Sequence, residues 1–239
     1  MKSPTGTLIA LSTFLARATK AFSPTTQLHF ATSITQYHRF PITVKMSSSS
    51  SDGKKRVLVP IAEDSEEIET SSITDVLTRF GAEVVVASVQ PDGELVCKMS
   101  RGLKICADVT IENASKEEWD LIALPGGMPG AKYLRDSEVL AEMLRNQQKQ
   151  NKLYGAVCAS PAVVLQSLGL LGPGSTCYPA VPFRSTMVSP SDDKVVVQDN
   201  VITSQGPGTS LLFALSLGEQ LVSLKQMFDI SPLLYNDGK

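Results

Sequence analysis

The sequence predicts an α/β protein whose mostly parallel sheet is covered by helices on both faces. Short β-rich apolar runs recur along residues 54–239, and segments with helical spacing of apolar residues lie between them. Strands that are apolar at nearly every position are typical of parallel sheets, because such sheets are buried on both sides. No uncharged apolar run approaches the roughly 18 residues needed to cross a bilayer, so no membrane contact is expected.

The first elements are strands separated by one clear helix. "RVLVPIA" (56–62) predicts a buried strand, and the helical pattern that follows it ends at Gly81. Further strands are predicted over 82–89, over 103–111 and at "DLIALPGG" (120–127), which ends in a glycine pair.

The second half continues the alternation. Ser137 is a candidate N-cap for a helix over 137–150. The elements expected after it are a strand at "KLYGAVC" (152–158), a helix over 160–171, a hairpin over 194–204 and a last helix over 206–224. Ligands of such sheets bind beyond the carboxyl ends of the strands. "EDSEEIET", "PGG" and "CASP" lie at those ends, so chemistry is expected on one edge.

Residues 1–53 differ in composition from the rest of the chain. The first 51 residues contain five Lys or Arg, no Asp or Glu, and many Ser and Thr, which is typical of an organelle transit peptide. A chloroplast or mitochondrial address is expected, and the Ser/Thr content favours the plastid; a disordered tail is the alternative. Translation from Met46 would give a cytoplasmic or nuclear form. Residues 54–239 are expected to form a single domain.

The folded part lacks histidine, since His29 and His38 both lie in the leader. This absence argues against a Cys–His nucleophile pair and against a zinc site. No dinucleotide fingerprint or phosphate-binding loop motif is present, so no cofactor and no metal are expected. The net charge of −2 argues against a nucleic-acid partner.

Cys158 lies where a buried strand is expected to give way to a helix. The unpaired amides and the dipole of a helix N-terminus stabilise a thiolate, and Pro161 suits the first helical turn. A reactive cysteine is one interpretation, and a buried inert cysteine is the other.

Two further groups could act on that sulfur. Glu66, Glu67 and Glu69 crowd the end of the first strand, where a buried carboxyl would have a raised pKa and hold a proton. The alternative is a solvated acidic first helical turn. The amides of Gly126 and Gly127 could form an oxyanion site, or the glycines could simply make a tight turn.

Four motifs together carry a family resemblance. "VLVPIAEDSEEIET", "DLIALPGG", "AVCASPA" and "ITSQGPGTS" occur in this order, and the chain resembles the ThiJ/PfpI superfamily over about residues 55–235, most of all its DJ-1 branch. The resemblance implies a flavodoxin-like sandwich that forms a homodimer. It implies that Cys158 is the nucleophile, that Glu69 is its protonated partner, and that Gly127 and Ala159 supply amides. It also places Arg101 near the dimer interface and the site.

The resemblance implies a cofactor-independent glyoxalase and deglycase that acts on small reactive aldehydes or glycated groups and protects against glycation and oxidative stress. The alternative is a cysteine-based redox sensor or a chaperone-like protective protein. Three positions depart from the family pattern. Tyr178 stands where a His is frequent, Gln205 replaces a frequent Arg, and Ser160 replaces a common Gly and is expected to add a hydroxyl beside the thiol. Tyr178 is therefore a candidate substrate contact.

Overall fold

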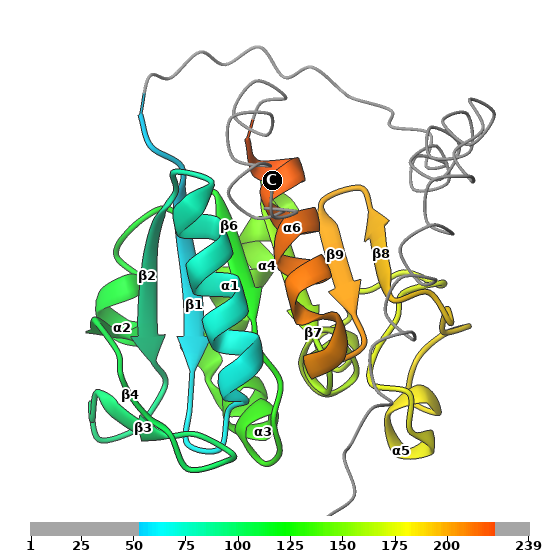
Figure 1. Cartoon of the computed structure of the whole chain (residues 1–239), viewed down its shortest axis with the longest axis horizontal. Coiled ribbons are helices and arrows are strands. Elements are labelled where there is room, and N and C mark those ends of the chain that lie inside the picture. The colour runs from blue at the N-terminus through cyan, green and yellow to red at the C-terminus, as the bar shows by residue number, and fades with distance from the viewer. Residues whose placement is uncertain (1–52, 223–239) are drawn as a thin grey trace, which may run out of the picture. The chain divides into compact units, whose positions relative to one another are not determined.

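The fold is a seven-stranded sheet with helices on both faces, seen in a computed structural model that describes residues 53–222 (Figure 1). The strand order is β5-β2-β1-β6-β7-β9-β8, and every pairing is parallel except the β8–β9 hairpin. The strands are β1 (Arg56–Ile61), β2 (Glu83–Ser88), β5 (Val109–Thr110), β6 (Leu121–Leu124), β7 (Leu153–Val157), β8 (Val195–Gln198) and β9 (Val201–Ser204). The predicted flavodoxin-like α/β class is confirmed. The leader, apart from Gly53, and the end of the last predicted helix lie outside the described residues.

Two helices cover one face of the sheet and four helical segments cover the other. The first pair is α1 (Glu67–Arg79) and α6 (Ser210–Leu221), which lie side by side across the sheet (Figure 1). The second set is α2 (Ile111–Ala114), α3 (Gly130–Asp136), α4 (Glu138–Lys149) and the π-helical η3 (Pro161–Gln166). The short segments α5 (Val181–Arg184) and η4 (Pro207–Thr209) lie in the loops. In the described residues, no helix is both long and apolar enough to span a bilayer.

Strand β1 shows why the apolar runs form this sheet. Val57 and Val59 pack with the residues of α1 and α6, whereas Leu58 between them packs with those of α3 and α4. Successive side chains of a strand point to opposite faces, so a strand between two helical layers must be apolar at both sets of positions.

Several segments differ from the sequence prediction. The predicted strand over 103–111 is two strands, β4 (Lys104–Cys106) and β5, because Asp108 turns the chain toward β2, where its carboxylate accepts the Val86 amide at 2.8 Å. β4 pairs with β3 (Val96–Lys98) in a separate hairpin, which was not predicted, and neither were α3 and α5. The helix expected over 160–171 is regular only over the six residues of η3. The Ser137 cap is confirmed, since its hydroxyl accepts the Leu140 amide at 3.3 Å.

Candidate active site

Cys158 and Glu69 meet at the carboxyl ends of the central strands. Three segments converge there: the first turn of α1 contains Glu69, the β6–α3 loop contains Gly126 and Gly127, and the β7–η3 turn contains Cys158. The parallel order of β1, β6 and β7 brings the three segments together, since each strand ends at the same edge.

The backbone of Cys158 is held in an unusual conformation. Its φ is +66°, in the left-handed region that non-glycine residues rarely occupy. The Cys158 amide donates to Ser204 O on β9 at 3.0 Å, and the Cys158 carbonyl accepts the Tyr178 amide at 2.7 Å. Because two separate segments hold this strained residue, the turn presents a half-buried thiol at the sheet edge in a fixed direction.

The three glutamates have three different roles. Glu66 caps α1, with its carboxylate accepting the Glu69 amide at 2.8 Å. Glu67 accepts the Arg101 amide at 2.8 Å and the Ser100 hydroxyl at 3.0 Å. Only Glu69 is fully buried beside the thiol, where its Oε2 accepts the Gly126 amide at 2.6 Å.

Burial perturbs both members of the pair. It raises the pKa of Glu69 to about 7, with the Glu66 charge adding to the rise and the Gly126 amide opposing it. Burial also raises the pKa of the Cys158 thiol, followed by the charge of Glu69 and the hydrogen bond to it, while the Gly127 and Ala159 amides act in the opposite direction. The Glu69–Cys158 contact affects both pKa values. The buried Oε1 of Glu69 accepts no regular hydrogen bond from the described residues.

The contact between Glu69 and Cys158 couples the protonation of the carboxyl to that of the thiol. After burial, the negative charge of Glu69 is the next cause of the rise at Cys158, and this part of the rise disappears when Glu69 holds the proton. The neutral carboxyl then becomes a donor, and a thiolate would face that donor and the amides of Gly127 and Ala159. We therefore treat Glu69 and Cys158 as a pair that shares one proton.

The glycine loop is built for close approach. A Cβ on Gly126 would lie 2.6 Å from the Cys158 Cβ and 3.0 Å from Glu69 Oε2. Gly127 has a φ of +92°, and a Cβ there would collide with the backbone of Asp64. Both positions therefore need glycine, and their amides lie beside the two reactive groups.

Tyr178 lies next to the thiol and Arg101 lies farther out along the edge. The Tyr178 ring is 41% exposed and meets Phe183 edge-on at 5.9 Å. A Cβ on Gly206 would lie 3.2 Å from that ring and 4.0 Å from the Cys158 sulfur, so all three are neighbours. Arg101 is exposed in the β3–β4 loop, and its guanidinium donates to Ser100 O.

The contacts of Ser160 and Gln205 show what these two departures from the family pattern do in the fold. The Ser160 hydroxyl donates to Pro125 O at 2.5 Å, so it joins the β7 and β6 turns instead of serving the thiol. The Gln205 amide donates to Asp192 O at 2.9 Å and holds the loop before β8. Sequence reasoning missed Ser204 and Gly206, although the "SQGPG" stretch already indicated a tight turn at this edge.

Comparison with known proteins places this site in a family. The model of the DJ-1/PfpI family matches residues 55–220. The chain belongs to the DJ-1/PfpI family. It is similar to Protein DJ-1 homolog B of Arabidopsis thaliana, with 45% identity over 77% of this chain and 42% of that protein. It therefore spans less than half of that relative, and the same is true of Protein DJ-1 homolog A of the same plant, which is 43% identical over 69% of this chain and 42% of its own length.

Two further DJ-1 relatives match over most of their own length. Glutathione-independent glyoxalase DJR-1.2 of Caenorhabditis elegans is 39% identical over 69% of this chain and 87% of that protein. The solved structure of oxidized Toxoplasma gondii DJ-1 is 46% identical and covers 76% of this chain and 98% of that chain, with a TM-score of 0.71. These matches place the chain in the DJ-1 branch of the family.

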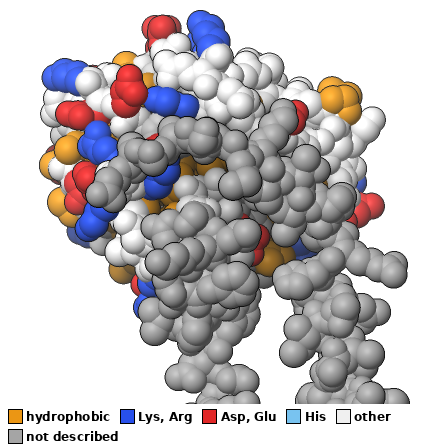
Figure 2. All heavy atoms as spheres, turned by 90° about the horizontal axis from the view of Figure 1, so that it is seen from above, with side chains coloured by type: hydrophobic (Ala, Val, Ile, Leu, Met, Phe, Trp, Pro, Cys, Tyr) orange, Lys and Arg blue, Asp and Glu red, His pale blue; other side chains and the backbone are white. Residues whose placement is uncertain are grey.

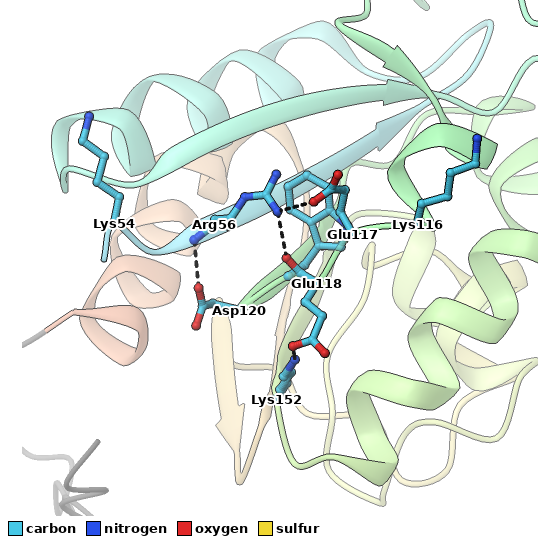
Figure 3. Close-up of a pocket in the computed structure, with 8 residues that line it drawn as sticks. Lys54, Arg56, Lys116, Glu117, Glu118, Asp120 and Lys152 are labelled. Atoms are coloured by element: carbon cyan, nitrogen blue, oxygen red, sulfur yellow. Dashed lines mark hydrogen bonds and ion pairs between the residues drawn. The ribbon is translucent and has the colours of Figure 1, made fainter. Parts of the chain in front are cut away.

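The opposite edge of this DJ-1/PfpI domain carries a pocket of about 460 Å³ (Figure 3). It lies where the parallel strands begin, at the end seen in Figure 2, where Lys, Arg, Asp and Glu side chains are interspersed. Arg56 pairs with Glu117 at 3.1 Å and lies 4.5 Å over the Trp119 ring, and Lys152 pairs with Glu118 at 3.0 Å. Its charges largely satisfy one another, so we assign the chemistry to the Cys158 edge.

No described group of His, Cys, Asp or Glu side chains is arranged to hold a metal ion. Cys97 and Cys177 are buried and Cys106 is exposed, and all are free thiols. Cys158 differs from these three in its positive φ and its buried carboxyl neighbour.

Proposed function

We propose that this protein is a cofactor-independent glyoxalase and deglycase that converts methylglyoxal or glyoxal to hydroxy acids. One observation carries the proposal: a fully buried carboxyl, Glu69, contacts the strained Cys158 thiol, and the amides of Gly127 and Ala159 face the same sulfur. This arrangement supplies a nucleophile, a proton carrier and an oxyanion site. The relative named a glutathione-independent glyoxalase supports the same reaction class.

The first half of the reaction joins the substrate to the enzyme. The Cys158 thiolate adds to the aldehyde carbon of methylglyoxal, and the protonated Glu69 gives its proton to the new alkoxide. The product is a hemithioacetal, and Glu69 is left as a carboxylate that can act as a base. No oxidant is used in this step.

The second half moves hydrogen between the two carbons. Glu69 removes the proton on the carbon bonded to sulfur and returns it to the neighbouring carbon, while the hydroxyl proton passes to the former ketone oxygen. The resulting thioester is cleaved by one water molecule, which releases lactate and restores the thiol. The Gly127 and Ala159 amides stabilise the oxyanions that form on the way.

Glutathione-free lactate formation from methylglyoxal tests the proposal. Cys158→Ser should abolish turnover, and Glu69→Gln should lower kcat by about 100-fold or more, since it removes the general acid–base group. Cys106→Ser is the matched control, because this exposed cysteine lies outside the site. Lactate formation that survives both site variants would refute the mechanism.

A redox role is the second candidate, because the pair that activates the thiol for aldehydes also exposes it to peroxide. In this role Cys158 is oxidised to a sulfinate that Glu69 and the neighbouring amides hold, and the protein acts as a sensor or chaperone-like protector. Mild peroxide should then oxidise Cys158 ahead of Cys97, Cys106 and Cys177 in mass spectrometry. Equal oxidation of all four thiols would argue against it.

We also propose a homodimer formed through the α1 and β3–β4 surface. Ile68, Val96 and Leu103 are apolar and 54%, 42% and 53% exposed there, and Arg101 lies beside Leu103. Light scattering after size-exclusion chromatography should show twice the monomer mass, and Leu103→Glu should shift it toward the monomer. For the leader, we propose an organelle address, which a fusion of residues 1–50 to a fluorescent reporter would test.

A further inference from the structure

A second pocket opens directly beside the candidate site. It has a volume of about 520 Å³ and lies between the start of α3, the helix η3 and the segment α5. We call it the α3–η3 groove and define it by Met128, Lys132, Arg135, Val163, Gln166 and Phe183. The glyoxalase steps above make no use of it.

The groove is joined to the Cys158 site at its near end. Met128 follows Gly127 in the glycine loop, and Phe183 packs edge-on against Tyr178, whose amide holds the Cys158 carbonyl. Its far end is marked by Arg135 in the last turn of α3. The rise along α3 from Gly130 to Arg135 is about 7.5 Å, the length of two to three residues of extended peptide.

The charges of the groove have one sign. Lys132 and Arg135 line it, and no Asp or Glu does. Arg135 also pairs with its neighbour Asp136 at 2.7 Å, whereas no ion pair involves Lys132 in the described part of the chain. The Lys132 ammonium lies near Asp136, whose pKa it lowers, and as an exposed side chain without an ion pair it can still contact an anionic partner in the groove.

The walls between these cations combine apolar surface with a polar group. Met128, Val163 and Phe183 offer contact area for a chain. Gln166 Oε1 is buried with no hydrogen-bond partner among the described residues. A rotation of this side-chain amide would let the oxygen accept a hydrogen bond from a backbone N–H of a bound peptide. Such a bond would satisfy the buried acceptor.

We propose that the α3–η3 groove binds the acidic peptide segment that flanks a glycated side chain, so that the adduct itself reaches Cys158. The inference rests on the proposed function, because it names the substrate class of that site. It requires two to three residues of extended chain, of which at least one carries a carboxylate. Free methylglyoxal is too small to reach this groove from Cys158, so its turnover should not depend on the groove residues.

Two peptides provide the test. Both are acetylated and amidated pentapeptides with a central cysteine, flanked on each side by two Asp in one and by two Lys in the other. Fluorescence polarisation measures binding of the unmodified peptides, and lactate release is measured from their methylglyoxal hemithioacetals. We expect the Asp peptide to bind about tenfold tighter than the Lys peptide at low salt and to lose this advantage as salt rises.

A pair of double variants separates the groove from general charge effects. Lys132→Glu with Arg135→Gln should abolish the preference for the Asp peptide and leave turnover of free methylglyoxal unchanged. Lys54→Glu with Lys116→Gln makes the same charge change at the opposite edge (Figure 3) and should preserve the preference. Gln166→Leu should weaken binding of both peptides without lowering the free energy of unfolding.

Each arm has an outcome that overturns the inference. Equal binding of the two peptides, or the same loss of preference in both double variants, would refute the groove as the binding site. The fluorescence polarisation measurement of peptide binding does not depend on turnover. A clear preference for the Asp peptide without any lactate release would therefore refute the proposed function and leave the groove standing.

Discussion

Replacing Gly126 with alanine should damage the site directly, because the new methyl group would meet both Cys158 and Glu69. The new Cβ would lie 2.6 Å from the Cys158 Cβ, 3.0 Å from the Ala159 amide nitrogen and 3.0 Å from Glu69 Oε2. Carbon atoms pack at about 3.5–4.0 Å, so the glycine loop and the Cys158 turn must separate by about 1 Å. Such overpacking costs roughly 1–3 kcal/mol of stability.

The same displacement should affect chemistry more than folding. A misplacement of about 1 Å costs on the order of 100-fold in rate, and it also lengthens the 2.6 Å bond from the Gly126 amide to Glu69. Lactate formation reports the rate, urea denaturation reports the stability, and mass spectrometry reports how fast peroxide oxidises Cys158. The last measurement remains informative even if the protein is not a glyoxalase.

Gly172→Ala is the matched control, because a Cβ there meets nothing within 4 Å and the backbone is not left-handed. It should leave all three measurements unchanged. If Gly126→Ala keeps turnover and thiol oxidation within about twofold of the parent protein, the close approach of the two loops does not determine reactivity and our reasoning is wrong.

Three other predictions follow from buried groups. Burial raises the Glu69 pKa from 4.5 to about 7, so the native state binds more protons than the unfolded state between these pH values. The free energy of unfolding, measured by urea titration, should therefore fall by about 3 kcal/mol as pH rises from 4.5 to about 7. If the parent protein and Glu69→Gln show the same pH dependence, this prediction is wrong. Ser160→Ala leaves the Pro125 carbonyl without its donor and should cost about 1–3 kcal/mol in the same titrations, whereas Ser167→Ala on the exposed surface should cost almost nothing. Gly218→Ala would place a Cβ 2.7 Å from the Phe80 ring between α1 and α6 and should lower Tm, with the open Gly208→Ala as control; equal Tm values would show that the two helices adjust freely.

The central strands could be predicted from the sequence because burial on both faces leaves a strong signal. Val57, Leu58 and Val59 must all be apolar, and the same holds for the four residues of β6. The rule that ligands bind beyond the strand ends then located the three site segments. Short elements gave no such signal. β3 has three residues, two of them exposed, so no apolar run marks it, and β4 was predicted only as part of the strand over 103–111.

The partner of Cys158 could not be chosen from local sequence alone. Glu66, Glu67 and Glu69 are similar in charge and context, and only the start of α1 separates them. With Glu66 as the N-cap, Glu69 falls one turn inward and is buried, while Glu67 stays on the surface and binds the Arg101 loop. The π-helical geometry of η3 was equally hidden, because apolar spacing over six residues does not distinguish helix types.

The distribution of the site over separate crossovers has a consequence for folding. Glu69 and the Gly126 amide are 57 residues apart in sequence, and Cys158 lies beyond two further helices and a strand. Contacts of such long range form late, because the chain must first close large loops. A newly made or partly unfolded molecule therefore carries an ordinary thiol at position 158. The reactivity that we propose for this cysteine should appear only with the complete sheet. Its rate of labelling by a thiol reagent should therefore report when the last step of folding is complete.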